Sequence, residues 1–137
     1  YDVMLCGEKL SIKTATNDPG IKILWTADTE YAEQEISTGY QPEYDILLIN
    51  IFWGQEKESV FYIPLLTQKE ILNNLGRRVY LSSSKGTNNR GIEIRKEAIR
   101  HLKKDNNTLS FPVNWVTPNI QYSEPWDEWD KYWRDIP

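Results

Sequence analysis

The sequence predicts an α/β (α+β) fold in which a mixed central sheet is flanked by helices. Three observations indicate this class: a strand–turn–strand pattern at residues 1–15, a nearly continuous apolar run at 44–53, and capped helical patterns between the predicted strands. A chain of 137 residues is long enough for one compact core and short for two. We therefore expect a single domain over residues 1–137.

Residues 1–15 are predicted to form a tight β-hairpin. Gly7 and Glu8 form its expected two-residue turn, with glycine at the first position. With this turn, the numbers of facing residues add up to 15, so Asp2 faces Lys13. Because facing residues project from the same side of a hairpin, a carboxylate and an ammonium are expected within a few ångströms of each other.

A third strand is expected at residues 21–25, after dense turn chemistry at 16–20. It is predicted to run antiparallel to the second strand, so that the sheet begins as a β-meander. The apolar run at 44–53 (YDILLINIFW) is typical of a central strand buried on both faces, and residues 59–63 return as its neighbour.

Capping residues indicate where the helices lie. A short helix is expected at 28–36, with Asp28 as its cap and Gly39 beyond its end. Thr67 and Glu70 have the spacing of a capping box and predict the start of the next helix. The remaining expected elements are a strand at 77–81, a polar loop at 82–91, a helix at 92–104, and an edge strand at 108–116 that is broken at Pro112.

The charge is unevenly distributed. The whole chain has a net charge of −4, whereas residues 85–104 carry seven basic and two acidic side chains. This basic region contains the residue types that reach phosphates and base edges, and Arg90 and Asn89 are suited to guanine and adenine, respectively. The alternative is a solvated helix face beside a polar loop. The candidate DNA-binding residues are Lys85, Asn88, Asn89, Arg90 and Arg95.

The cysteine count and the hydropathy of the sequence indicate the cellular compartment of the protein. Cys6 is the only cysteine, so no internal disulfide can form, and its spacing from His101 does not resemble a zinc site. A reducing cytoplasm is therefore expected. No apolar run approaches the roughly 20 residues of a membrane helix. Because the first residue is Tyr1 within a strand pattern, we expect a further segment upstream.

Asp2 and Lys13 together provide two parts of a phosphodiesterase site. Hydrolysis of a phosphodiester needs a divalent ion to offset developing charge, a carboxylate to hold that ion, and a cation near the attacking water. Mg²⁺ is held by one or two carboxylates and keeps several waters. The alternative reading is an exposed cross-strand ion pair without function, contributing under about 1 kcal/mol to stability.

The stretch at residues 1–14 (YDVMLCGEKLSIKT) resembles the PD-(D/E)xK nuclease superfamily, most of all type II restriction endonucleases. The order of hairpin, third strand, helix and central strand over residues 1–53 also resembles the core of that family. The resemblance implies that Asp2 binds Mg²⁺, that Lys13 positions the nucleophilic water, and that the main-chain carbonyl of Ile12 completes the metal shell.

The chain departs from the family pattern at Ser11, where a second carboxylate is expected. Some restriction enzymes resemble this arrangement, with serine at that place and the acid supplied from a following helix. Glu30 and Asp28 are the candidates here, and an upstream acid is another. The resemblance implies a Mg²⁺-dependent, sequence-specific endonuclease that cuts double-stranded DNA to leave 5′-phosphates. It also implies a homodimer acting on palindromes.

Two other functions remain open at this point. The 6 tryptophans and 8 tyrosines allow a binding module that stacks glycans or peptides on aromatic side chains. However, Trp126, Trp129 and Trp133 have helical spacing in the tail and are expected to pack against the domain or a second subunit. The strand residues Trp25, Phe52 and Trp53 are expected to be buried. The third possibility is an inactive nuclease fold that binds DNA, with Ser11 marking a decayed site.

Overall fold

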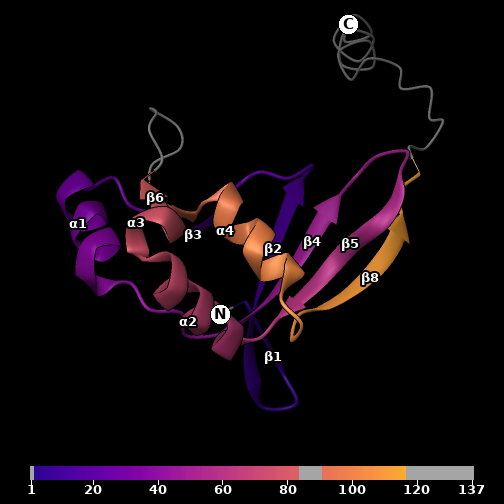
Figure 1. The fold of residues 1–137 in the computed structure, drawn as a ribbon, viewed down its shortest axis with the longest axis horizontal. Coiled ribbons are helices and arrows are strands. Elements are labelled where there is room, and N and C mark those ends of the chain that lie inside the picture. Colours follow the sequence, from indigo (N-terminus) through magenta and orange to yellow (C-terminus); the bar gives the residue numbers. More distant parts are fainter. Residues whose placement is uncertain (1, 84–90, 117–137) are drawn as a thin grey trace, which may run out of the picture.

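The computed structural model describes residues 2–83 and 91–116. Figure 1 shows their strands and helices. The five-stranded sheet has the order β1(Val3–Leu5), β2(Glu8–Thr16), β4(Asp45–Ile51), β5(Glu56–Ile63), β8(Leu109–Asn114), and the three-stranded sheet has the order β3(Ile21–Leu24), β7(Ile92–Ile94), β6(Leu81–Ser83). The helices are α1(Thr29–Gln34), the π-helix η1(Glu35–Gly39), α2(Leu65–Leu75), α3(Arg77–Tyr80) and α4(Lys96–Lys104). No helix in the described ranges is long and apolar enough to cross a membrane.

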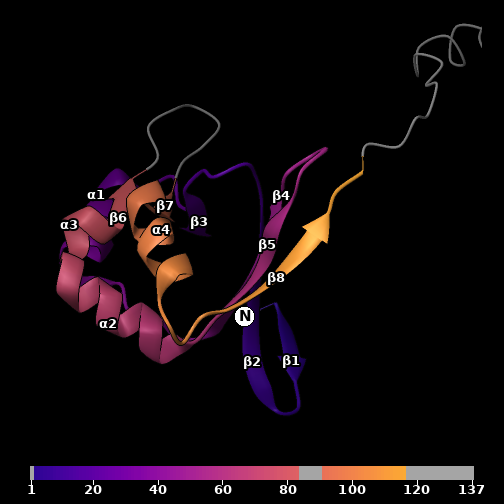
Figure 2. The ribbon, with the colours of Figure 1, turned by 45° about the vertical axis from the view of Figure 1, so that its right-hand side comes forward.

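The helices lie on one side of the five-stranded sheet, together with the smaller sheet (Figures 1 and 2). The core forms between these layers. Leu48 and Ile63 contribute to it from the large sheet, Ile94 from the small sheet, and Leu102 from α4, and all four are fully buried. This arrangement confirms the predicted α+β class with a mixed sheet flanked by helices.

The strand β4 occupies the centre of the large sheet, as predicted. It runs parallel to β2 and antiparallel to β5. Its burial alternates along the strand: Ile46 and Leu48 are buried, whereas Leu47 and Ile49 are half-buried. The prediction of burial on both faces was therefore wrong, because helices cover only one face of the sheet.

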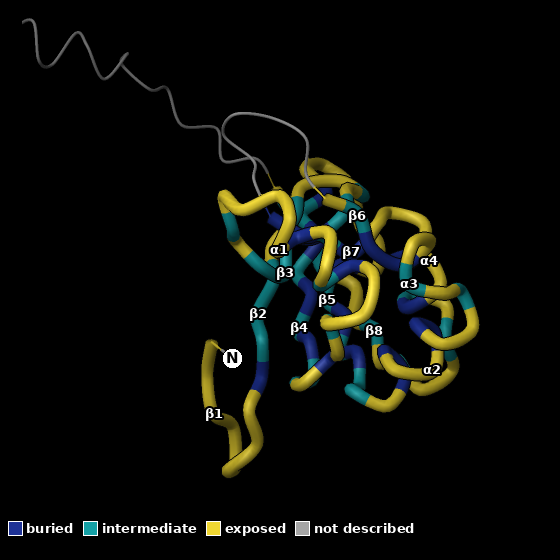
Figure 3. The backbone as a smooth tube through the Cα atoms, turned by 90° about the vertical axis from the view of Figure 1, so that its left-hand side faces the viewer, coloured by how far each residue is buried: buried dark blue, intermediate teal, exposed yellow. Residues whose placement is uncertain are grey.

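The hairpin exists, but its turn is one residue earlier than predicted. Val3 pairs with Leu10 and Leu5 pairs with Glu8, so that Cys6 and Gly7 form the turn. Their φ angles of 51° and 88° are both positive, which is the requirement of a type I′ turn. The predicted Gly7–Glu8 turn was wrong because glycine takes the second position. The hairpin stands clear of the body, and β1 is exposed (Figure 3).

The expected β-meander does not form. The edge of β2 that the third strand was predicted to occupy is taken by β4, in a parallel pairing of seven residues from Leu10 to Thr16. The chain leaves the sheet at Asn17, which has a φ of 63° and donates its N–H to the Ile51 carbonyl oxygen. The next strand, β3, pairs antiparallel with β7 in the second sheet.

The start of α2 also differs from the prediction. The helix begins at Leu65, after Pro64, and Thr67 is a buried residue within it. No capping box is therefore formed by Thr67 and Glu70. Instead, the Asp45 carboxylate accepts a hydrogen bond of 2.6 Å from the Leu65 N–H. A side chain from β4 thus satisfies a helix donor that the local sequence leaves open.

Several further predictions can be compared with the structure. Asp28 caps α1 as expected, and β8 lies at a sheet edge as Pro112 indicated. The strand predicted at 77–81 was wrong, because this segment is mostly helical. The helix predicted at 92–104 is present from Lys96, but residues 92–94 form a strand instead of its first turn. Phe52 is buried, but Trp25 and Trp53 are 68% and 50% exposed, contrary to prediction.

Candidate active site

The Asp2 carboxylate lies beside three consecutive residues of β2. Its Oδ2 accepts hydrogen bonds from Ser11 Oγ at 3.0 Å and from the Ile12 N–H at 2.6 Å. Lys13 Nζ lies 3.7 Å from the same oxygen. The prediction that Asp2 directly faces Lys13 was wrong, because the numbers of paired residues in the hairpin add up to 13 and not 15. The expected proximity of the two side chains nevertheless holds.

The main chain at Ile12 faces the same edge of the sheet as Asp2. In a strand, the N–H and the C=O of one residue point to the same side. Since the Ile12 N–H donates to Asp2, the Ile12 carbonyl is also directed to that side. The predicted oxygen ligand and the predicted carboxylate ligand are consequently neighbours.

Hydrogen bonding and charge keep Asp2 ionised. The hydrogen bond from the Ile12 N–H is the largest cause that lowers the pKa of this carboxyl below its ordinary value, and the Ser11 hydroxyl and the Lys13 ammonium add to it against a smaller desolvation effect. The Asp2 side chain is 47% exposed and that of Lys13 is 24% exposed. The pair is accessible to solvent and to a ligand.

Ser11 and Lys13 form one wall of a cleft. They project from the helix-covered face of the sheet, because their partners in β4 are Ile46 and Leu48, which are buried. The cleft has a volume of about 460 Å³. It is lined by Ser11, Lys13, Ile23, Leu24, Tyr31, Glu35, Gly39, Tyr40, Gln41, Glu43, Tyr44, Ile46 and Gln68.

The acidic residues of this cleft are Glu35 and Glu43, neither of which the sequence reasoning selected. Glu35 is half-buried and Glu43 is exposed. Glu30, the predicted second acid, is exposed in the first turn of α1 and does not line the cleft. The other candidate, Asp28, uses its Oδ1 to accept the N–H groups of Glu30 and Tyr31 as the helix cap.

A signal for Glu35 was present in the sequence. It lies within the helical segment predicted at 28–36 and precedes the helix-ending Gly39 by four residues. Its side chain is therefore one turn from the point where the chain returns toward β4. Among the acidic residues of the predicted helix, the one nearest the end that leads back to the sheet was the better candidate, since the second acid must approach a site on β2.

The donor set fits a divalent cation that keeps much of its hydration. Within the described residues, no group of three or more His, Cys, Asp or Glu side chains is close enough to hold a metal by itself. Mg²⁺ needs fewer protein ligands than that, since one or two carboxylates with waters suffice. Asp2 and Ile12 provide two oxygen donors, and Glu35 lies in the adjoining cleft.

The predicted DNA-binding residues Lys85, Asn88, Asn89 and Arg90 lie outside the described part of the chain, as do the tail tryptophans. Arg95 is described and exposed. Its Nε donates to the Leu81 carbonyl oxygen at 2.7 Å, and its N–H donates to that of Tyr80 at 2.8 Å. These bonds hold the start of α4 against the junction of α3 and β6.

Known proteins resemble this chain in sequence and in fold. The model of the family described as "Restriction endonuclease ThaI" matches residues 1–135. A search of curated proteins found no match. The chain is similar to a solved "Restriction endonuclease in complex with substrate DNA", with 35% sequence identity and a TM-score of 0.79. The likeness covers 98% of this chain and 65% of that one, so the chain spans less than two thirds of the neighbour's length.

These matches confirm the resemblance to type II restriction endonucleases and do not favour an aromatic binding module. The family model covers nearly the whole chain, including the hairpin, the cleft and both sheets. The chain belongs to the ThaI restriction endonuclease family.

Proposed function

We propose that this chain carries the catalytic centre of a sequence-specific endonuclease that hydrolyses phosphodiester bonds in double-stranded DNA. The observation that carries the proposal is the placement of Lys13 Nζ 3.7 Å from Asp2 Oδ2 at the wall of a cleft. Family membership and the DNA-bound structural neighbour support the same activity.

Each residue of the site has a distinct role in the proposal. Asp2 would be the first carboxylate ligand of Mg²⁺, and the Ile12 carbonyl would be an oxygen ligand beside it. The Ser11 hydroxyl orients Asp2 by donating to Oδ2 at 3.0 Å. Lys13 holds and orients the water that attacks phosphorus, because its ammonium can donate a hydrogen bond and stabilise the developing negative charge.

Glu35 is proposed as the second carboxylate, in place of Glu30. It lies in the same cleft as Ser11 and Lys13, whereas Glu30 does not. When bound, Mg²⁺ would neutralise charge that develops on the phosphate oxygens. Glu43 also lines the cleft and is the alternative acid. The attack on phosphorus would leave a 5′-phosphate, as the family resemblance implies.

The remaining parts of the proposal come from the sequence. Lys85, Asn88, Asn89, Arg90 and Arg95 are proposed to contact DNA phosphates and base edges. A homodimer is proposed because a two-fold axis matches a palindromic target. The cytoplasm remains the expected location, since the single cysteine fits a reducing compartment.

The test is plasmid cleavage with and without Mg²⁺ by the wild-type chain and four variants. Asp2→Asn and Glu35→Gln are expected to lower the cleavage rate by at least about 100-fold, since each removes a charged ligand. Glu30→Gln is the matched control and is expected to retain the wild-type rate. Glu43→Gln resolves the alternative acid. DNA binding without cleavage by the wild-type protein would instead indicate an inactive nuclease fold.

A further inference from the structure

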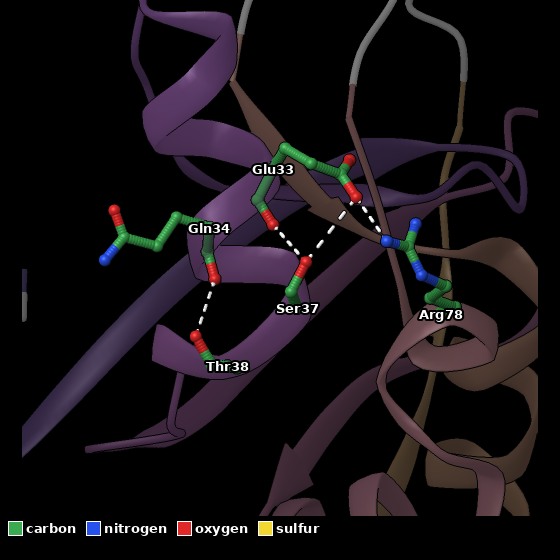
Figure 4. Close-up of polar contacts among 5 residues, drawn as sticks. All are labelled: Glu33, Gln34, Ser37, Thr38 and Arg78. Atoms are coloured by element: carbon green, nitrogen blue, oxygen red, sulfur yellow. Dashed lines mark hydrogen bonds and ion pairs between the residues drawn. The ribbon is translucent and has the colours of Figure 1, made fainter.

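The carboxylate of Glu35 sits on an unusual turn of helix. After α1, the chain widens into η1, where the Tyr40 N–H donates to the Glu35 carbonyl oxygen at 2.8 Å. This bond spans five residues, and π-turns of this kind often occur at functional sites. Ser37 Oγ donates to the Glu33 carbonyl at 2.6 Å and Thr38 Oγ1 to that of Gln34 at 3.2 Å (Figure 4). At the junction of α1 and η1, side-chain hydroxyls thus bond to carbonyls one turn earlier, a contact that often accompanies a bend in a helix.

Gly39 provides the space that the Glu35 carboxylate occupies. A Cβ at position 39 would lie 2.7 Å from Glu35 Cδ and 2.8 Å from Oε2, and it would also overlap Oε1. Real Cβ atoms essentially never approach other atoms so closely. The backbone of Gly39 is not in the positive-φ region, so glycine is not needed there for its conformational freedom. Its absent side chain is what the carboxylate requires.

Arg77 fixes the end of the same turn. Its Nη1 donates to the Tyr40 carbonyl oxygen at 2.8 Å, and the contact is partly buried. Since the Tyr40 N–H bonds to Glu35, this arginine ties the turn that carries Glu35 to α3. The neighbouring Arg78 pairs with Glu33 across the same elements (Figure 4), but this pair is 69% and 51% exposed. Exposed ion pairs contribute little to the stability of a fold.

We propose that Gly39 and Arg77 are positioning residues that hold the Glu35 carboxylate in the cleft for a divalent cation. The inference rests on the proposed role of Glu35 as the second carboxylate. Gly39 and Glu35 both line the cleft with Lys13, so a displaced carboxylate would change its place relative to the site on β2. Displacing a flexible side chain costs little stability, and the effect should therefore fall on metal binding.

The experiment measures Mn²⁺ affinity by electron paramagnetic resonance and thermal unfolding of the same samples. Gly39→Ala is expected to weaken Mn²⁺ binding by about 10-fold, as is usual when a residue that orients a metal ligand is changed. Its melting temperature should stay within a few degrees of wild type. In the Glu35→Gln background the same substitution should have no further effect, because Gly39 acts through that carboxylate.

Substitutions of Arg77 test the same inference independently of Gly39. Arg77→Ala is expected to weaken Mn²⁺ binding several-fold, Arg77→Lys to restore part of the loss, and Arg78→Ala to leave it unchanged. Wild-type affinity in both Gly39→Ala and Arg77→Ala would overturn the inference, as would an equal loss from Gly39→Ala with Glu35→Gln already present. If Glu35→Gln alone leaves the affinity unchanged, the proposed second carboxylate fails, and the inference fails with it.

Discussion

One aspartate–lysine pair lies beside the middle of β2 and another lies just beyond its end, and the two pairs are built differently. Lys13 Nζ is 3.7 Å from Asp2 Oδ2 and borders the cleft. Lys103 Nζ is 2.6 Å from Asp18 Oδ1, and its side chain is only 12% exposed. The first pair leaves its ammonium available for a further partner, whereas the second is closed. Residue types alone therefore do not distinguish a candidate catalytic pair from a structural one.

The surroundings of Lys103 explain the closed pair. Its ammonium lies 4.7 Å from the centre of the Phe61 ring, and Asn50 Nδ2 also approaches Asp18 Oδ1, at 3.3 Å. These contacts join α4, β4, β5 and the loop after β2. Within the described residues, Asp2, in contrast, forms hydrogen bonds and an ion pair only with residues of β2. One pair connects elements of the fold, and the other belongs to a single hairpin.

The largest expected effect is the loss of DNA cleavage when the ammonium of Lys13 is removed. Lys13→Met keeps the aliphatic stem and removes the ammonium, so DNA cleavage should fall by about 100- to 10,000-fold. Since the pair is partly exposed, the free energy of unfolding should change by less than about 1 kcal/mol. Single-turnover cleavage and urea unfolding measure the two quantities. A variant that is strongly destabilised but still cuts DNA would assign Lys13 a structural role.

Lys103→Met is expected to show the opposite behaviour. Loss of a half-buried, charge-assisted hydrogen bond should lower the free energy of unfolding by about 1.5 to 3 kcal/mol. The folded variant should cleave DNA at close to the wild-type rate, because Lys103 is not part of the cleft. Urea titration checks the stability. A normal stability would show that the Asp18 pair does not hold α4 in place.

The smallest expected effect is on the pH dependence of the free energy of unfolding. Burial tends to raise the pKa of Asp18, but the hydrogen bond and charge of Lys103 outweigh it and hold that pKa below the ordinary value of 3.8. A depressed carboxyl pKa stabilises the fold above the unfolded-state value and loses that contribution as the pH falls through the folded-state value. Stability should therefore decrease below about pH 4.

Asp18→Asn should make that decrease smaller, by under about 1 kcal/mol, because the Asp18 side chain is 42% exposed. It should not abolish the decrease, since the pKa of Asp2 is lowered as well. Urea unfolding at pH 5 and pH 3 provides the comparison. An identical pH dependence in wild type and Asp18→Asn would contradict the proposed stabilisation by Lys103.

Local sequence patterns predicted much of the fold and part of the candidate site. The hairpin, the central β4, the cap of α1 at Asp28 and the edge position of β8 all depend on neighbouring residues, and each was predicted. The proximity of Asp2 and Lys13 also followed from a two-stranded pattern. The exact turn did not, because Cys6 adopts a positive φ that few non-glycine residues take.

Two of the features that were missed depend on distant parts of the chain. The third strand pairs with β7, about seventy residues later, which no turn pattern at 16–20 could indicate. The start of α2 is fixed by Asp45, twenty residues before the helix. Glu35 lines the cleft, and Gly39, four residues later, leaves the space for its carboxylate. The first two features are tertiary contacts, whereas the third depends on a π-helical turn that the helical pattern at 28–36 does not reveal.

The most direct test of the account is the Mg²⁺-dependent cleavage rate of Asp2→Asn beside that of Asp18→Asn. Asparagine at position 2 can still accept the hydrogen bond from the Ile12 N–H, so the hairpin should remain folded while the charge that binds the cation is lost. We predict a loss of at least about 100-fold for Asp2→Asn and near wild-type cleavage for Asp18→Asn. Wild-type cleavage by the Asp2→Asn protein would contradict the site.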